Sequence, residues 1–233
     1  TYNHWITNLK NIITIDGPSG VGKGTLAMAL AEKLQWHYLN SGSLYRILAY
    51  LSEKNNIDIS DATALVNLVN NLEISFEIDN GCLKIILNNT DIHELIQNEE
   101  CAKKASKIAL IQELRMALIK TQRSFYKNPG LIAEGRDMGS VIFTEAELKF
   151  FLKASNHIRA ERRHKQLKQK GINVSLTQLI HKLDQRDERD LNRSVSPLVI
   201  PEGAVIINTD GLDINEVINT ASKSIEKILK IKI

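Results

Sequence analysis

The chain has 233 residues, 43% hydrophobic and 24% charged, a composition ordinary for a globular protein with one sizeable core. Its formal net charge of +3 is too small to favour nucleic acid or a membrane surface as a partner. No apolar run approaches the roughly 18 residues that a membrane span needs. Residues 1–10 lack the apolar stretch of a secretory signal, and we place no site residue there. We therefore expect one cytoplasmic domain over residues 1–233, a monomer that acts on small molecules.

The cysteines and histidines predict no transition-metal site. Cys82 and Cys101 form no C-x-x-C pair, and none of the six histidines sits in an H-E-x-x-H pattern. Two free thiols in a reducing cytosol are the expected state.

Short apolar runs alternate with helical patterns along most of the chain. Buried strands are predicted at residues 11–16, 36–40, 131–133, 148–152 and 205–207. Helical periodicity occupies residues 22–34, 44–51 and 91–127. Strands that alternate with helices predict an α/β fold, with a parallel sheet flanked by helices.

Residues 72–88 differ from this pattern. Apolar side chains alternate on either side of the turn sequence Asp79-Asn80-Gly81, which is typical of a β-hairpin. The segment predicts a small antiparallel β insertion within the βα pattern.

A glycine-rich loop joins the first predicted strand to the first predicted helix. It consists of Gly17, Pro18, Ser19, Gly20, Val21, Gly22, Lys23, Gly24 and Thr25. Phosphate oxygens can be surrounded by backbone N–H groups only where no Cβ intrudes, and the helix N-terminus adds partial positive charge. The loop therefore predicts a nucleotide-phosphate site. The alternative is a glycine-rich turn that only starts a helix.

Lys23 is expected to reach the β and γ phosphates of ATP. The general motif places Ser or Thr directly after the Lys, whereas Gly24 intervenes here and Thr25 follows. We therefore expect no side chain to bind Mg²⁺ directly. If one does, Thr25 is the candidate.

A phosphate loop alone fits a GTPase, a motor ATPase or a kinase. The D-x-x-G and N-K-x-D patterns of GTPases are absent from the sequence. A kinase with an anionic acceptor needs further cations and a lid that excludes water. A regulatory or scaffold protein with a vestigial loop remains the alternative, although it would have no second phosphate to hold.

Cations occur where an acceptor site is expected. Arg46 lies on the helix after the second strand, with Ser41 predicted at the N-cap of that helix. Arg136 and Asp137 follow the strand at 131–133, and open α/β sheets bind ligands at the carboxyl ends of their strands.

Two later segments are also rich in arginine. Residues 156–171 carry several Lys and Arg side chains, although composition alone favours a solvated helix face. Farther along, Arg186, Arg189 and Arg193 are spaced to share one helical face, where like charges repel. Either an anionic ligand or Asp190 can relieve that repulsion, and the spacing does not decide between them.

Four segments together resemble bacterial cytidylate kinases, P-loop nucleoside monophosphate kinases, over about residues 11–230: IDGPSGVGKGT, LNSGSLYR, LIAEGRDMGSVIF and RDERDLNRSVSPL. The resemblance implies transfer of the ATP γ-phosphoryl group to CMP or dCMP with Mg²⁺. It also implies a monophosphate-binding insertion at about 41–110 and a lid at about 156–171. The alternative enzyme is a kinase for UMP or another small metabolite.

The resemblance further implies a role for particular residues. The acceptor phosphate is assigned to Ser41, Arg46 and Arg136, cytosine to Ser106, Arg115 and Asp137, and the ribose and phosphates to Arg186, Asp190 and Arg193. The candidates for stabilising the transferring group are Lys23, Arg136, Arg162 and Arg193, with Arg159 or Arg163 as substitutes for Arg162. Asn40 and Glu134 both stand where many members of that family carry Asp.

Overall fold

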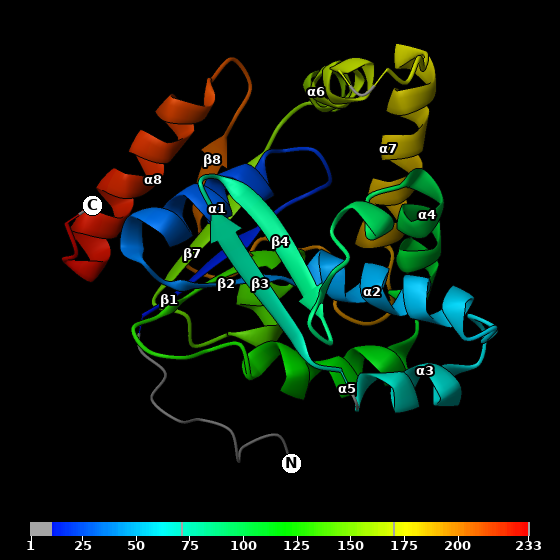
Figure 1. Ribbon diagram of the computed structural model, residues 1–233. Coiled ribbons are helices and arrows are strands. Elements are labelled where there is room, and N and C mark those ends of the chain that lie inside the picture. Colours follow the sequence, from blue (N-terminus) through cyan, green and yellow to red (C-terminus); the bar gives the residue numbers. More distant parts are fainter. Residues whose placement is uncertain (1–10, 71, 170, 233) are drawn as a thin grey trace.

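The computed structural model describes residues 11–70, 72–169 and 171–232. Its central sheet has five parallel strands in the spatial order β2-β6-β1-β7-β8 (Figure 1). They are β1 (Ile12–Asp16), β2 (His37–Asn40), β6 (Leu131–Gly135), β7 (Leu148–Lys153) and β8 (Val205–Asn208). Every strand predicted for the sheet is confirmed to within two residues, whereas residues 1–10 lie outside the described part of the chain.

Helices cover both faces of the sheet, so its strands are apolar on both sides. Ile13 and Ile15 pack with α1 (Lys23–Leu34) and α8 (Ile214–Leu229). Ile12 points to the other face, because successive strand residues alternate, and contributes to a second core. The helices of that second core are α2 (Ser41–Lys54), α3 (Ala62–Val69), α4 (Glu99–Ile108) and α5 (Gln112–Arg123).

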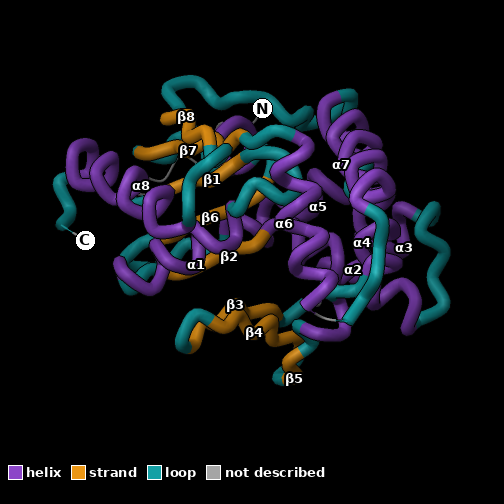
Figure 2. Tube along the Cα trace, turned by 90° about the horizontal axis from the view of Figure 1, so that it is seen from above, coloured by secondary structure: helices purple, strands orange, loops and turns teal. Residues whose placement is uncertain are grey.

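The predicted hairpin is confirmed as β3 (Ile74–Asp79) and β4 (Cys82–Leu87), and the two-residue strand β5 (Thr90–Asp91) extends it. Asn80 and Gly81 both have positive φ, as a tight hairpin turn requires. Figure 2 shows these strands as a layer separate from the main sheet. The small antiparallel element therefore sits beside the sheet rather than in it.

The continuous helical pattern predicted for 91–127 was too simple. This stretch contains a 3₁₀ turn (Glu94–Ile96) and the separate helices α4 and α5. The side chain of Asn98 accepts a 2.7 Å hydrogen bond from the backbone N–H of Cys101, so it caps a new helix. Helix α3 was not predicted.

Helices α6 (Asn156–Gln169) and α7 (Leu176–Leu191) form an arm beside α4 (Figure 1). A small core of Ala160, Leu167 and Leu179 holds the two helices together. Lys170, part of the predicted lid, lies outside the described residues. None of the described helices is long and apolar enough to cross a membrane. Cys82 and Cys101 are both free thiols, as predicted.

Candidate active site

The glycine-rich loop leaves β1 at Asp16 and enters α1 at Lys23. A Cβ at Gly17 would lie 2.3 Å from the carbonyl oxygen of Leu152, so the loop can turn here only at glycine. The Nζ of Lys23 donates a 2.7 Å hydrogen bond to the carbonyl oxygen of Pro18 and is buried. The lysine is thus held against its own loop.

The surroundings of Lys23 disfavour its charge. Burial holds the pKa of Lys23 well below its ordinary value, and the charges of Arg136 and Arg186 lower it further. Glu134 opposes this shift. A negatively charged ligand at the loop would therefore stabilise the charged lysine.

The sheet order brings distant residues to the loop. Strand β6 lies between β1 and β2, with Asp16 opposite Gly135 and Asn40 opposite Glu134. Because the strands are parallel, their carboxyl ends meet at one edge, where α/β sheets bind ligands. Arg136 and Asp137 follow β6 directly and so face the same edge.

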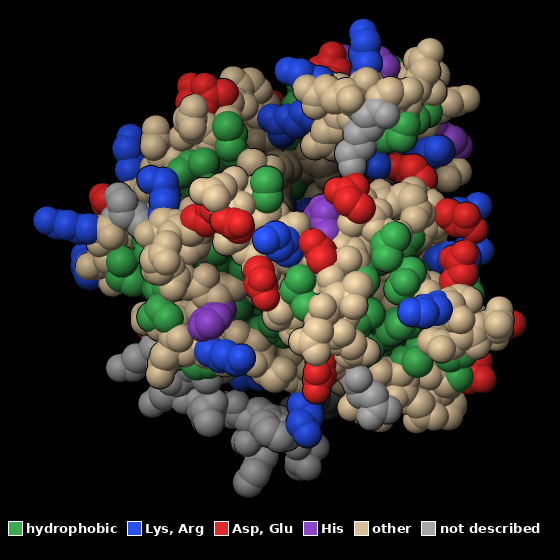
Figure 3. Space-filling view, in the orientation of Figure 1, with side chains coloured by type: hydrophobic (Ala, Val, Ile, Leu, Met, Phe, Trp, Pro, Cys, Tyr) green, Lys and Arg blue, Asp and Glu red, His purple; other side chains and the backbone are tan. Residues whose placement is uncertain are grey.

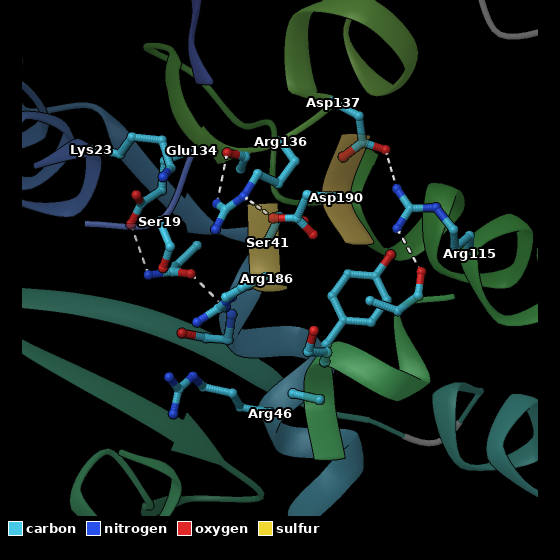
Figure 4. Close-up of a pocket in the computed structure, with 18 of the residues that line it drawn as sticks. Ser19, Lys23, Ser41, Arg46, Arg115, Glu134, Arg136, Asp137, Arg186 and Asp190 are labelled. Atoms are coloured by element: carbon cyan, nitrogen blue, oxygen red, sulfur yellow. Dashed lines mark hydrogen bonds and ion pairs between the residues drawn. The ribbon is translucent and has the colours of Figure 1, made fainter. Parts of the chain in front are cut away.

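A cavity of about 250 Å³ opens beside the loop, and we call it the acceptor pocket. The residues predicted to bind the acceptor all line it: Ser41, Arg46, Ser106, Arg115, Arg136, Asp137, Arg186, Asp190 and Arg193. Figure 4 shows Lys23 and Glu134 on one side, Arg115 and Asp137 on the other, and Arg136 with Asp190 between them. The fold therefore gathers residues from β6, α2, α4, α5 and α7 around one space.

Arg115 and Asp137 form an ion pair in which each side chain is 5% exposed. The guanidinium also donates a 3.1 Å hydrogen bond to the carbonyl oxygen of Ala109. Burial opposes the charge on Arg115, but Tyr45 and Asp137 outweigh it and raise the pKa of Arg115. The two groups thus present a fixed acceptor and a fixed donor to the pocket.

Asp190 is shared by two arginines. Its carboxylate accepts a 2.8 Å hydrogen bond from Nε of Arg136 and lies 3.2 Å from Nη2 of Arg193. Burial opposes ionisation of Asp190, but the charges of Arg136, Arg193 and Arg186 hold its pKa below the usual value. Asp190 therefore stays ionised and orients two cations, one just after β6 and one just after α7.

Arg186 lies outside that hydrogen-bond network. Within the described residues it makes no hydrogen bond or ion pair, and burial together with Arg136 lowers its pKa to about 10. Asp190 relieves the arginine repulsion along α7 only in part. The spacing of Arg186 and Arg193 did not decide whether Asp190 or an anionic ligand relieves this repulsion. In the described part of the chain Arg186 has no ion-pair partner, which is compatible with an anionic ligand.

The start of α2 corrects one prediction. Asn40, not Ser41, is the N-cap, because its Oδ1 accepts a 2.9 Å hydrogen bond from the N–H of Ser43. Ser41 is the first helical residue, and its hydroxyl donates to Oε1 of Gln122 at 2.7 Å. Ser41 still faces the acceptor pocket, while Arg46 donates to the carbonyl oxygen of Ile96 at 2.6 Å.

The arginines of α6 lie apart from the acceptor pocket. Arg162 donates to the hydroxyl and carbonyl oxygens of Thr209, at 2.9 and 2.7 Å. Arg159 is buried and bonded to Asp187 and to the carbonyl oxygen of Ser19, so it ties the arm to the loop. Of the residues predicted to stabilise a transferring group, Arg162 alone does not line the pocket.

A second and larger cavity, about 850 Å³, separates α4 from the arm. Figure 3 shows a hollow beneath α6, with basic side chains near it. Arg162 and Arg163 line it from α6, and Arg163 pairs with Glu99 across it. Arg189, which was not predicted as a site residue, donates a 2.9 Å hydrogen bond to the hydroxyl of Ser106. Its spacing from Arg186 and Arg193 was the available signal.

Asp16 is fully buried beneath the loop. Its carboxylate accepts hydrogen bonds of 2.9 and 2.8 Å from the N–H groups of Met138 and Gly139, at the start of a π-helical turn (Met138–Ile142). Burial nevertheless raises the pKa of Asp16 to about 7. The sequence pattern gave no indication that Asp16 binds the backbone of this turn.

A parallel sheet with a phosphate loop after β1, set beside a second pocket lined by cations, defines a kinase of the P-loop class. The family model described as cytidylate kinase matches residues 13–227. The cytidylate kinase of Aeromonas salmonicida is 46% identical over 209 residues, which are 90% of this chain and 91% of that protein. That of Sodalis glossinidius is 45% identical over 224 residues, 96% and 99% of the two chains. That of Escherichia coli is 45% identical over 216 residues, 93% and 95% of the two chains.

The chain therefore belongs to the cytidylate kinase family, and it is an enzyme of that family.

Titration of Asp16 predicts a specific pH dependence of stability. The unfolded chain loses this proton near the ordinary pKa of 3.8, whereas the folded chain keeps it up to about pH 7. The folded state therefore binds more protons in between, and its stability falls as the pH rises. Relative to Asp16→Asn, the free energy of unfolding should fall by about 3 kcal/mol between pH 5 and pH 8, at about 1.4 kcal/mol per pKa unit.

Urea denaturation at each pH measures this difference. Asp79→Asn, at an exposed carboxylate of the hairpin, is the matched control: it keeps Asp16, so its free energy of unfolding should follow that of wild type with pH. A difference between wild type and Asp16→Asn that stays constant with pH would contradict the assignment.

Proposed function

We propose that the enzyme transfers the γ-phosphoryl group of ATP to CMP and dCMP, giving ADP and CDP or dCDP. The observation that carries this proposal is the acceptor pocket, where Lys23 of the phosphate loop lines the same cavity as Arg136, Arg186 and Arg193. Two polyanions must approach each other in such a reaction, and the cations reduce the cost of their repulsion.

The phosphate loop is the donor site. Its backbone N–H groups and the N-terminus of α1 would hold the ATP phosphates, with Lys23 as a mobile charge. The residues present fit Mg²⁺ that arrives with the nucleotide. Glu134 offers a carboxylate and Thr25 a hydroxyl beside the loop, and the described residues contain no cluster of three or more metal-binding side chains. When bound, Mg²⁺ neutralises charge on the phosphates.

The acceptor phosphate would be held by Ser41, Arg46 and Arg136. Arg186 would also bind it, because this arginine forms no ion pair within the described residues and its pKa is lowered by burial and by Arg136, so an anion would stabilise its charge. The attacking oxygen of a nucleoside monophosphate is already anionic at neutral pH. No general base is therefore required, and in-line positioning with charge neutralisation carries the reaction. Arg193, oriented by Asp190, would stabilise the transferring group together with Lys23 and Arg136.

Arg162 would join these groups through movement of the arm. Residues at about 156–171 would form the lid, and residues at about 41–110 the monophosphate-binding insertion. The larger cavity between α4 and the arm supports this division, because closing it would bring α6 toward the loop and exclude water.

The base would be read by the buried ion pair. Cytosine offers an N4 amino donor beside the N3 and O2 acceptors, whereas uracil presents an O4 acceptor and an N3–H donor. Asp137 can accept from N4 and would repel O4, and Arg115 donates only. Arg115 and Asp137 are paired and buried, so they cannot turn to suit another base. A base with the wrong donors and acceptors would leave some of their hydrogen-bonding atoms without partners. Such mismatches permit strong rejection.

Lys23→Ala should preserve the fold and lower kcat by about 10²–10³, the cost typical of removing one preorganised group that binds transition-state charge. A coupled assay of ADP formation with CMP measures it, and Lys33→Ala, at an exposed lysine of the same helix, is the control. Turnover near that of wild type would refute the donor site.

Asp137→Asn should narrow base discrimination. The same coupled assay, run with CMP, dCMP and UMP, should show strong preference for the cytosine nucleotides in wild type. In the variant the ratio of kcat/KM for CMP over UMP should fall at least about tenfold, because an amide no longer repels O4. Asp58→Asn, at an exposed carboxylate, should leave the ratio unchanged.

The competing interpretation is that Asp137 only holds Arg115 and supports the loop. In that case activity on every acceptor would fall together, and an unchanged CMP-to-UMP ratio would refute the base-reading role.

A further inference from the structure

Tyr38 makes a contact that the mechanism above does not use. This β2 residue is 4% exposed, and its hydroxyl donates a 2.5 Å hydrogen bond to Oε1 of Glu134. Burial, reinforced by the charge of Glu134, raises the pKa of Tyr38 well above its ordinary value. Tyr38 therefore remains protonated and donates across the physiological pH range.

Asn40 binds the same carboxylate oxygen. Its Nδ2 donates to Oε1 of Glu134 at 2.8 Å, while its Oδ1 caps α2 through Ser43. Tyr38 and Asn40 lie two residues apart on β2 and so project from the same face of the sheet, with Asn40 opposite Glu134 on β6. Oε1 is thus held by two donors, and within the described residues Oε2 accepts no hydrogen bond.

Gly24 leaves room for the carboxylate on the other side. A Cβ at Gly24 would lie 3.1 Å from Oε1 and 3.7 Å from Oε2 of Glu134. The carboxylate thus occupies the space beside the first turn of α1 where another residue would place its side chain. A larger residue at position 24 would therefore crowd Oε1 of Glu134.

The hairpin supports Tyr38 from behind. The ring of Phe76 on β3 meets that of Tyr38 edge to face, with centroids 5.9 Å apart, and packs on Phe125 at 5.3 Å. A glutamate side chain has several rotatable bonds, and its freedom would be lost each time it had to be oriented. Tyr38 and its aromatic support remove that freedom in advance.

We propose that Tyr38 is a positioning residue, which holds Glu134 so that its free oxygen, Oε2, accepts hydrogen bonds from the hydrated divalent cation that accompanies ATP. The proposal rests on the proposed function, because it requires ATP to bind at the loop with its metal. Mg²⁺ keeps several water molecules in such sites and uses few carboxylates, so a single oriented glutamate suits it. Partners that orient a metal's ligands matter to affinity even though they do not touch the metal.

Calorimetric titration of ATP without acceptor, once with Mg²⁺ and once with EDTA, tests the proposal. The ratio of the two dissociation constants is the metal coupling factor. Tyr38→Phe keeps the ring against Phe76 and removes only the hydroxyl, so it should lower this factor about tenfold, the low end for losing such a partner. Its affinity for metal-free ATP should stay within about twofold of wild type. That change is much smaller than the tenfold change expected in the coupling factor, which corresponds to about 1.4 kcal/mol. Tyr50→Phe, on α2, should change neither constant.

Glu134→Gln provides the second variant. The amide oxygen still accepts from Tyr38 and Asn40, but the amide nitrogen replaces Oε2 and can only donate. The coupling factor should fall at least as far as in Tyr38→Phe. Adding Tyr38→Phe to Glu134→Gln should then lower it no further, because both changes remove one interaction.

The outcomes separate this inference from the proposed function. If wild type bound ATP equally well with Mg²⁺ and with EDTA, both the metal part of the proposed function and the role of Tyr38 would be overturned. Normal metal coupling in wild type together with an unchanged factor in Tyr38→Phe would overturn the positioning role alone. Equal weakening with Mg²⁺ and with EDTA, or additive effects in the double variant, would show that Tyr38 serves only packing.

Discussion

The residues lining the acceptor pocket carry more positive than negative charge, and the geometry of the site follows from how this surplus is held. Burial lowers the pKa of Lys23 and of Arg186, and the charge of Arg136 lowers both further. The available carboxylates do not remove this strain. Asp190 orients two arginines, and Asp137 is committed to Arg115. The arrangement is costly alone and becomes favourable when phosphates enter.

The order of the strands makes that arrangement possible. With β6 between β1 and β2, one edge of the sheet holds the phosphate loop, Glu134 to Asp137 and the start of α2. Both faces of the sheet are covered by helices, so the edge itself is where polar groups can gather. The hairpin layer adds the aromatic support of Tyr38, which gives this insertion a part in shaping the site.

Sequence reasoning recovered the features that depend on neighbouring residues. The loop, the parallel strands and the hairpin turn were predicted from short motifs, and family resemblance named residues that line one pocket, whose roles stay predictions. Contacts between distant residues could not be read in this way: Tyr38 with Glu134 spans 96 positions, and Arg136 with Asp190 spans 54. The N-cap of α2 is Asn40, one residue before the predicted Ser41. Both residue types can cap a helix, and only the hydrogen bond from Ser43 shows which one does. Arg162 was placed by charge density, whereas its position depends on Thr209.

The surplus cations of the acceptor pocket are there, we propose, to bind an acceptor phosphate. Calorimetric dissociation constants for CMP and for cytidine test it, since the two ligands differ only in that group. If Arg46, Arg136 and Arg186 bind the phosphate, CMP should bind at least about 100-fold more tightly, because each hydrogen bond to a charged group contributes about 1.5–3 kcal/mol. Equal affinities for CMP and cytidine would contradict the account.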